Sequence, residues 1–328
     1  FRFENWFAPP NATGRETGYY SVNTREGMPM TSHTFDGLQP FTTHYWRVRY
    51  RDKALAWSEV ADERAVVTGP APVGACCLPD GTVRQLRESE CETAGGRFLG
   101  VGSADSECPE MVVLWREDFE GVALGPNTDE TLAESIAWSA GAPEGWVNDR
   151  SMMPAGGVTE WRGWAIADKD WWVRASGDQS RGQFDRASGN VAVADPDEWH
   201  DAERPDGGAF DASLISAQVS LSGIAAGSGV LSFDSTWDPY DEMRATITVR
   251  YDGGEPMTIM EWTSRQGEES FHPKNANERV AVRIQNPEGA EQATFTFRLD
   301  RGDNDWFWAI DNLQLSGEVE GVTTGHER

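Results

Sequence analysis

The chain has 328 residues, enough for one large domain or for two to three smaller ones. Its 54 acidic and 28 basic side chains give a formal net charge of −26, which argues against nucleic acid and against an anionic membrane surface as partners. No run of about 18 apolar residues is present, so we expect no membrane insertion. The 34 glycines and 15 tryptophans favour an all-β architecture with many turns.

Residues 1–69 form the first block, in which apolar and polar residues alternate most clearly over residues 43–50. This alternation predicts a strand with Trp46 and Tyr50 on one face. The chain begins at Phe1 rather than at a methionine, inside what has the pattern of another strand. We therefore interpret it as a trimmed or excised piece of a longer protein, whose chemistry need not lie in this piece.

The run Leu38-Gln39-Pro40-Phe41-Thr42, followed by the alternating strand, resembles the second half of a fibronectin type III domain. The resemblance covers about residues 35–68 and implies a β-sandwich. His44 stands where that family usually has a tyrosine, and few residues precede Gly37 to supply the first strands. We therefore expect a partial domain that is truncated at its N-terminus.

All four cysteines lie in the Gly- and Pro-rich block of residues 70–110, which predicts two disulfides in a secreted, extracellular or cell-surface protein. A zinc site is the alternative, but the adjacent pair lacks the two-residue gap of zinc knuckles. Because adjacent cysteines rarely bond each other, each of the first two should pair with one of the last two, in an order left open. The four residues are Cys76, Cys77, Cys91 and Cys108.

This cysteine block is too short for an apolar core of its own, so its bridges must hold it together. It resembles the small Cys-Cys-x-x-x-Asp-Gly modules of secreted bacterial multidomain proteins, planctomycete ones in particular, although only Leu78-Pro79 separate the cysteines from Asp80-Gly81 here. The resemblance implies a rigid spacer, and a binding knot is the alternative. A short helix is expected over residues 87–94.

Residues 111–318 form the main block, and a tail follows over residues 319–328. Short alternating segments separated by turn residues predict a two-sheet sandwich, a jelly roll. One short helix is expected over residues 159–174. After an opening strand that ends in acids near residue 117, the expected strands cover residues 191–194, 217–221, 230–234, 245–251, 257–262, 280–284, 293–299 and 307–315.

Three segments carry a family resemblance: Glu117-Asp118-Phe119-Glu120-Gly121, residues 210–216, and residues 306–313. Together with the Trp-rich stretches over residues 160–172 and 192–199, they resemble the MAM-like jelly rolls that bacteria append to secreted enzymes and adhesins. The subgroup is one associated with secreted bacterial hydrolases, metallophosphoesterases among them. The resemblance implies an accessory domain of a secreted bacterial protein.

The first and last strands of such a sandwich usually lie side by side, which would bring the acids that follow the first strand next to Asp311. Converging carboxylates suit Ca²⁺, so we predict a structural calcium ion, with the turn Asp303-Asn304-Asp305 as a second candidate. In so acidic a chain the alternative is that these residues cap backbone amides or face water. The predicted calcium ligands are Asp118, Glu120, Asp195, Asp197 and Asp311.

The tryptophans suggest a glycan site, because sugars stack their C–H faces on aromatic rings while polar neighbours bind their hydroxyls. The alternative is that most of these rings fill the ends of the sandwich. We favour residues from segments with turn chemistry: Trp199, Trp237, Asp238, Tyr240 and Arg244.

No Gly-x-Ser-x-Gly, His-Glu-x-x-His or P-loop motif is present, so we expect no catalytic site in this fragment. His200, beside Asp201, is interpreted as a surface turn residue. The leading hypothesis is a non-catalytic accessory region that binds a polysaccharide or other glycan through a calcium-stabilised jelly roll. The alternatives are a subunit of an extracellular fibre, stalk or adhesin that contacts neighbouring copies of itself, and a jelly roll with its own hydrolase activity.

Overall fold

The structure is a computed structural model that describes residues 2–6, 19–23, 38, 40–46, 58–59, 61–69, 72–79, 81–130, 136–205, 207–304 and 306–320. The chain divides into two compact units, residues 1–73 and 74–328. In the first unit, β1 (Arg2–Trp6) pairs with β2 (Tyr19–Asn23), and β3 (Thr43–Trp46) pairs with β4 (Arg64–Val67), all antiparallel.

The strand expected over residues 43–50 is therefore confirmed over residues 43–46, and its remainder lies outside the described residues. The fibronectin-like character of this unit stays a prediction.

The cysteine block forms a small antiparallel sheet in the order β6-β5-β7, built from β5 (Gly74–Cys77), β6 (Val83–Leu86) and β7 (Arg97–Phe98). Helix α1 (Glu88–Thr93) and the 3₁₀ helix η1 (Asp105–Glu107) complete it, which confirms the short helix expected there. Both predicted disulfides are formed, and their order is Cys76–Cys91 and Cys77–Cys108.

The cysteine block belongs to the same compact unit as the jelly roll. Gly95 abuts Ala281 so closely that a Cβ on the glycine would lie 2.0 Å from the alanine Cβ. Arg97 Nη1 is 2.7 Å from Glu318 Oε1, and Val319 N donates to the Glu110 carbonyl at 2.9 Å. These contacts hold the block against strands of the main sandwich.

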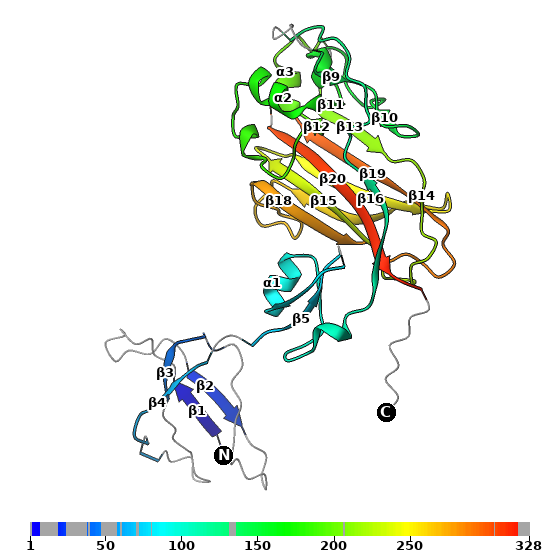
Figure 1. The fold of residues 1–328 in the computed structure, drawn as a ribbon. Helices are drawn as coiled ribbons and strands as arrows, with labels where there is room; N and C mark the ends of the chain where they lie inside the picture. Colours follow the sequence, from blue (N-terminus) through cyan, green and yellow to red (C-terminus); the bar gives the residue numbers. More distant parts are fainter. Residues whose placement is uncertain are drawn as a thin grey trace. The chain divides into compact units, whose positions relative to one another are not determined.

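The main block is a sandwich of two antiparallel sheets, which confirms the predicted all-β jelly-roll class (Figure 1). The first sheet has the order β10-β13-β19-β16-β17, with β14 also paired to β19. Its strands are β10 (Val147–Asp149), β13 (Phe210–Ile215), β14 (Val219–Ser220), β16 (Arg244–Tyr251), β17 (Met257–Thr263) and β19 (Gln292–Gly302).

The second sheet has the order β18-β15-β20-β12-β11-β9, and β8 also pairs with β20. The first strand of the sandwich thus lies beside its last, as predicted, with Trp115 opposite Leu315. The strands are β8 (Met111–Glu117), β9 (Trp138–Ser139), β11 (Trp164–Asp168), β12 (Asn190–Ala194), β15 (Val230–Asp238), β18 (Asn275–Arg283) and β20 (Phe307–Glu318).

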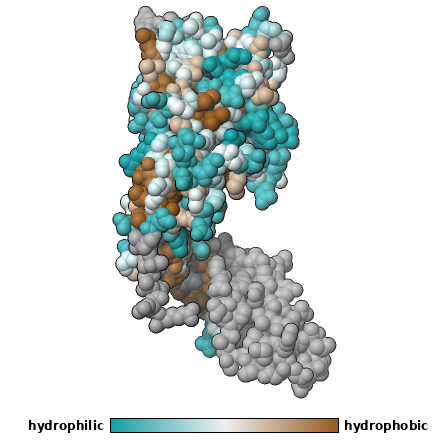
Figure 2. Space-filling model, turned by 90° about the vertical axis from the view of Figure 1, so that its right-hand side faces the viewer, coloured by the Kyte–Doolittle hydropathy of each residue, from teal (hydrophilic) through white to brown (hydrophobic). Residues whose placement is uncertain are grey.

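The core lies between the two sheets. Every second side chain of β16 and β19 enters it, whereas β12 and β15 are buried at every position. Ile247 of β16 and Phe297 of β19 are fully buried and in register with each other. Phe233 of the opposite sheet meets Phe297 edge-on, with ring centroids 6.0 Å apart. The alternate residues of β16 and β19 are polar and point away from the core. On the face in Figure 2, hydrophilic residues cover most of the coloured surface and hydrophobic ones form separate patches.

The prediction of a single helix over residues 159–174 is wrong for the middle of this segment. The segment forms the 3₁₀ helix η2 (Thr159–Trp161), strand β11 and helix α2 (Lys169–Ala175). Gly163, at a φ of +91°, breaks the helical path, and the residues that follow join β12 inside the sandwich. Asp168 then caps α2 by accepting a hydrogen bond from Trp171 N at 2.7 Å.

Two further helical turns lie at the same end of the sandwich, the 3₁₀ helix η3 (Arg181–Gln183) and helix α3 (Pro196–His200). Asp195 caps α3, and proline occupies its first turn, where the missing N–H costs nothing. The predicted turn at Asp195-Pro196 is thus the start of a helix. Within the described residues, no helix is long and apolar enough to cross a membrane.

Candidate functional site

The two tryptophans predicted to bind glycan lie inside the sandwich. Trp199 and Trp237 have no exposed surface. Trp199 Nε1 donates to the Gly156 carbonyl at 3.0 Å, and its ring meets Phe210 edge-on. Trp237 Nε1 donates to the His272 carbonyl at 3.2 Å. Neither ring has a free face, so the expectation that they line an open surface is wrong. They fill the end of the sandwich instead.

The other three predicted glycan residues are placed differently from one another. Asp238 is buried and forms an ion pair with Lys274, and burial raises the pKa of its carboxyl above the ordinary value. Tyr240 is 71% exposed, in the turn between β15 and β16. Arg244 starts β16 on the outer face of the first sheet, where it joins a larger polar group.

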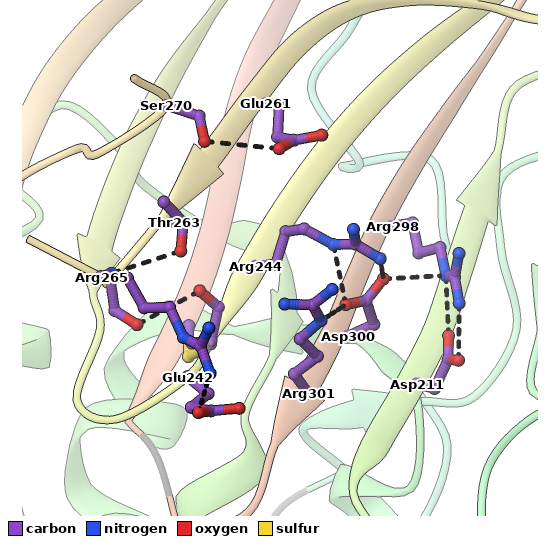
Figure 3. A network of polar contacts seen from close by, with 12 residues as sticks. Asp211, Glu242, Arg244, Glu261, Thr263, Arg265, Ser270, Arg298, Asp300 and Arg301 are labelled. Carbon is purple, nitrogen blue, oxygen red and sulfur yellow. Dashed lines mark hydrogen bonds and ion pairs between the residues drawn. The ribbon is translucent and has the colours of Figure 1, made fainter. Parts of the chain in front are cut away.

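This group, here called the arginine cluster, consists of Asp211, Arg244, Arg298, Asp300 and Arg301. It is built by register, because Asp211 of β13, Asp300 of β19 and Arg244 of β16 lie opposite one another on adjacent strands. Figure 3 shows its side chains converging from the three strands. The neighbouring residues in each strand, Ala212, Ala245 and Leu299, point into the core and fix the cluster on the outer face.

Two bidentate ion pairs organise the cluster. Arg244 Nε and Nη2 donate to Asp300 Oδ1 at 3.0 Å and Oδ2 at 2.7 Å. Arg298 Nε and Nη2 donate in the same way to Asp211, at 2.8 Å and 2.7 Å. These bonds raise the pKa of both guanidinium groups above the ordinary arginine value. Both arginines therefore stay charged, and both are held in one orientation.

The carboxylate of Asp300 lies lower on the face than the arginines around it. Its side chain is 5% exposed, whereas those of Arg244, Arg298 and Arg301 are 27%, 41% and 46% exposed. The acid thus anchors the group from below and the guanidinium groups face solvent. Such an arrangement can donate several oriented N–H groups to the oxygens of a ligand.

Polar contacts continue from the cluster toward the edge strand β17 (Figure 3). Arg265 forms an ion pair with Glu242, and Ser270 Oγ donates to Glu261 Oε1 at 3.3 Å. Thr246 of β16 stands between Glu261 and Arg298 in the same cross-strand row. Polar side chains therefore extend from the cluster across β16 to Glu261 of β17.

Sequence reasoning found only Arg244 of the cluster. Two other members, Arg298 and Asp300, belong to an alternating series of polar residues along β19. The series begins with Thr294 and Thr296, and all four residues are on the outer face. That pattern indicates a polar face but not its partners. The partners follow from the pairing of β13, β19 and β16, segments that lie far apart in the chain.

The five predicted calcium ligands fall in two places. Asp195 and Asp197 are ion-paired with Arg181, at 3.0 Å and 3.3 Å. Glu120 accepts a hydrogen bond from Asn190 N at 2.9 Å and lies in the electrostatic environment of Asp311. Asp118 accepts from the backbone N–H of Glu120 at 3.2 Å. Arg181 thus supplies the countercharge that a cation was expected to supply at Asp195 and Asp197.

Asp311 of β20 is buried, and Glu120, which follows the first strand of the sandwich, acts on it electrostatically. The sequence predicted that these two acids lie near each other. The carboxylate of Asp311 accepts from Asn312 N at 2.6 Å and from Ser188 N at 3.3 Å. Burial raises its pKa to about 7. Across the described ranges, no group of three or more His, Cys, Asp or Glu residues could hold a metal ion. Calcium binding therefore stays a prediction from sequence.

The remaining sequence candidates have local partners. Asp303 Oδ1 accepts from Arg204 Nη1 at 2.9 Å and lies 3.5 Å from His200 Nδ1. Arg204 also packs over the Trp199 ring, 5.0 Å from its centroid. Asp305, the third residue of the second cation candidate, lies outside the described residues. His200 thus belongs to a polar contact group at the end of the sandwich.

No protein-family model matches the chain, and no curated protein matches it in sequence. Among solved structures, the K1 cleaved adhesin domain of Lys-gingipain from Porphyromonas gingivalis W83 is 13% identical over 61% of this chain and 96% of its own, with a TM-score of 0.37. TmCBM61, solved with β-1,4-galactotriose, is 12% identical over 52% and 88%, with a TM-score of 0.31. An apo cyclase from Fischerella sp. is 13% identical over 64% and 98%, with a TM-score of 0.36. Likeness at this level does not indicate a function.

Proposed function

We propose that the jelly roll is a glycan-binding module and that it binds through the outer face of the first sheet, centred on the arginine cluster. The observation that carries the proposal is the pair of bidentate Arg–Asp contacts laid across three adjacent strands. These side chains are already ordered, so binding a ligand would cost little further side-chain entropy.

The chemistry of the face suits hydroxyl groups. A sugar hydroxyl both donates and accepts hydrogen bonds, and the exposed guanidinium groups of the face are donors. Thr246, Thr248 and Thr296 add hydroxyl groups on the same face. The exposed ring of Tyr240 lies four residues before Arg244 in the chain and can stack on a sugar. The two disulfides support a secreted or cell-surface location for such a module.

The test measures how strongly immobilised or gel-embedded polysaccharides retain the full chain. Retention of the unchanged protein is compared with that of the Arg298→Gln variant. This variant removes one bidentate contact from a side chain that is 41% exposed. We expect it to weaken retention about tenfold, the effect of losing a hydrogen bond to a charged group. Arg250→Gln is the matched control, because Arg250 is exposed on the same face of β16 but opposite Thr294.

Equal retention of Arg298→Gln and the unchanged protein would refute this location of the site. Failure to retain any of a broad panel of neutral and acidic polysaccharides would refute glycan binding itself. The alternative of a self-associating fibre or adhesin subunit predicts large assemblies, which light scattering on the same sample detects.

A further inference from the structure

We infer that the glycan bound at the arginine cluster is acidic, a polysaccharide with uronate carboxylates, and that Arg301 recognises its charge. The inference rests on the proposed glycan-binding function and adds the chemical class of the ligand. Its basis is a guanidinium group that the cluster holds in place but does not pair fully.

The two carboxylates of the cluster are already occupied. Arg244 holds both oxygens of Asp300, at 3.0 Å and 2.7 Å, and Arg298 holds both oxygens of Asp211. Arg301 Nε lies 3.6 Å from Asp300 Oδ1, beyond hydrogen-bond distance. Among the residues that the structure describes, none accepts a hydrogen bond from its guanidinium group. Its donors are available to a ligand.

The backbone places the Arg301 side chain on the outer face by means of a β-bulge and an unfavourable backbone conformation. Phe210 pairs with Gly302 and Asp211 with Asp300, so Arg301 is the extra residue of a β-bulge in β19. By simple alternation it would point toward the core, opposite to Asp300. Its φ of +65° is in the left-handed region, which a long side chain rarely adopts. The bulge instead leaves the side chain 46% exposed beside Asp300. Strain of this kind often marks functional positions.

The charge balance of the cluster also favours an anion. It contains three guanidinium groups and two carboxylates, so it is locally positive although the net charge of the whole chain is −26. Glu261 of β17 acts electrostatically on Arg244, but β16 separates it from β19, which carries Arg301. Glu242, which precedes β16, is paired with Arg265. A planar guanidinium matches a carboxylate in two parallel hydrogen bonds, so the unmatched group on β19 suits a uronate.

The test compares the binding of polygalacturonate with that of the same polysaccharide after its carboxyl groups have been reduced to alcohols. We expect the full chain to bind polygalacturonate at least tenfold more tightly. Arg301→Gln should abolish this preference, because its affinity for polygalacturonate should fall to that for the reduced polymer. Arg301→Gly, which tolerates the positive φ, should do the same without lowering the melting temperature. Arg250→Gln, which removes an equal charge elsewhere on the face, should keep the preference.

Each other outcome refutes a distinct statement. Equal binding of both polymers would overturn the acidic ligand and leave glycan binding intact. A preference that survives in both Arg301 variants, or that falls equally in Arg250→Gln, would overturn the role of Arg301. Binding of neither polymer would overturn this inference, and the proposed function fails with it only if the broad panel is also negative.

Discussion

Arg181 and Asp195 form a bidentate ion pair in which neither side chain has any exposed surface. Arg181 Nε and Nη2 each donate to one carboxylate oxygen at 3.0 Å. The guanidinium group also packs over the Phe307 ring, 4.7 Å from its centroid. Asp195 caps α3 with the same carboxylate by accepting from Glu198 N at 3.2 Å. One pair thus links η3, α3 and the start of β20.

Removing the arginine should therefore destabilise the jelly roll strongly. Arg181→Met would leave the buried carboxylate of Asp195 without its countercharge and would remove the guanidinium group that Asp197 and Glu198 also contact. We expect the free energy of unfolding to fall by about 3–5 kcal/mol, measured by urea denaturation. Arg186→Met is the control, since its side chain is 48% exposed and it should cost less than about 1 kcal/mol. Similar losses in the two variants would contradict this account.

Glu198, which contacts Arg181, makes the free energy of unfolding depend on pH. Burial and the nearby charge of Asp195 together raise the pKa of Glu198 to about 8, against the opposing effect of Arg181. The folded state then keeps a proton that the unfolded state loses near pH 4 to 5. Stability contributed by this proton is present at low pH and is lost as the pH rises to about 8.

Glu198→Gln should accordingly flatten the pH dependence of the free energy of unfolding between pH 5 and about 8. Urea denaturation followed by tryptophan fluorescence at several pH values measures it. Glu288→Gln, at an exposed position, should keep the slope of the unchanged protein. A steeper decline in the Glu198 variant than in the unchanged protein would show that the sign is wrong.

Gly95 is expected to control the docking of the cysteine block. It has a φ of +67°, and a Cβ there would lie 2.0 Å from Ala281 Cβ. Gly102 has a φ of +77° but nothing within 4 Å of such a Cβ. Both alanine variants carry the backbone cost of about 1–2 kcal/mol, whereas only Gly95→Ala adds a steric conflict worth about 1–3 kcal/mol.

Hydrogen exchange should therefore rise over residues 74–108 in Gly95→Ala at temperatures where Gly102→Ala is still protected. Equal protection of this segment in the two variants would mean that the contact with Ala281 does not hold the block. The two disulfides remain in both variants, so any difference reports docking rather than covalent linkage.

The sandwich could be predicted from sequence because its strands carry their own signal. Alternation along β16 and β19 marks core and outer positions locally, and the turn at Asp252-Gly253 separates β16 from β17. The neighbouring placement of the first and last strands was predicted from the usual build of such a sandwich, and it is confirmed by the pairing of Trp115 with Leu315.

The arginine cluster could not be predicted, because its contacts depend on long-range register. Asp211 and Arg298 are 87 residues apart, and only the pairing of β13 with β19 brings them together. The bulge at Arg301 leaves no mark in the pattern of apolar and polar residues. The helix expected over residues 159–174 failed for a related reason, since the strand pairing of residues 164–168 overrides their helical spacing.

The buried tryptophans lead to the last prediction, which separates a core role from a binding role. Trp199→Ala and Trp237→Ala should each lower the free energy of unfolding by about 3–5 kcal/mol, because each removes a fully buried ring. Tyr240→Ala, at a ring that is 71% exposed, should leave the melting temperature nearly unchanged while it weakens glycan retention. Retention measured per folded molecule should be unaffected in the two tryptophan variants, because the outer face of the first sheet remains intact. Loss of retention without loss of stability in those variants would instead place the sugar at the end of the sandwich.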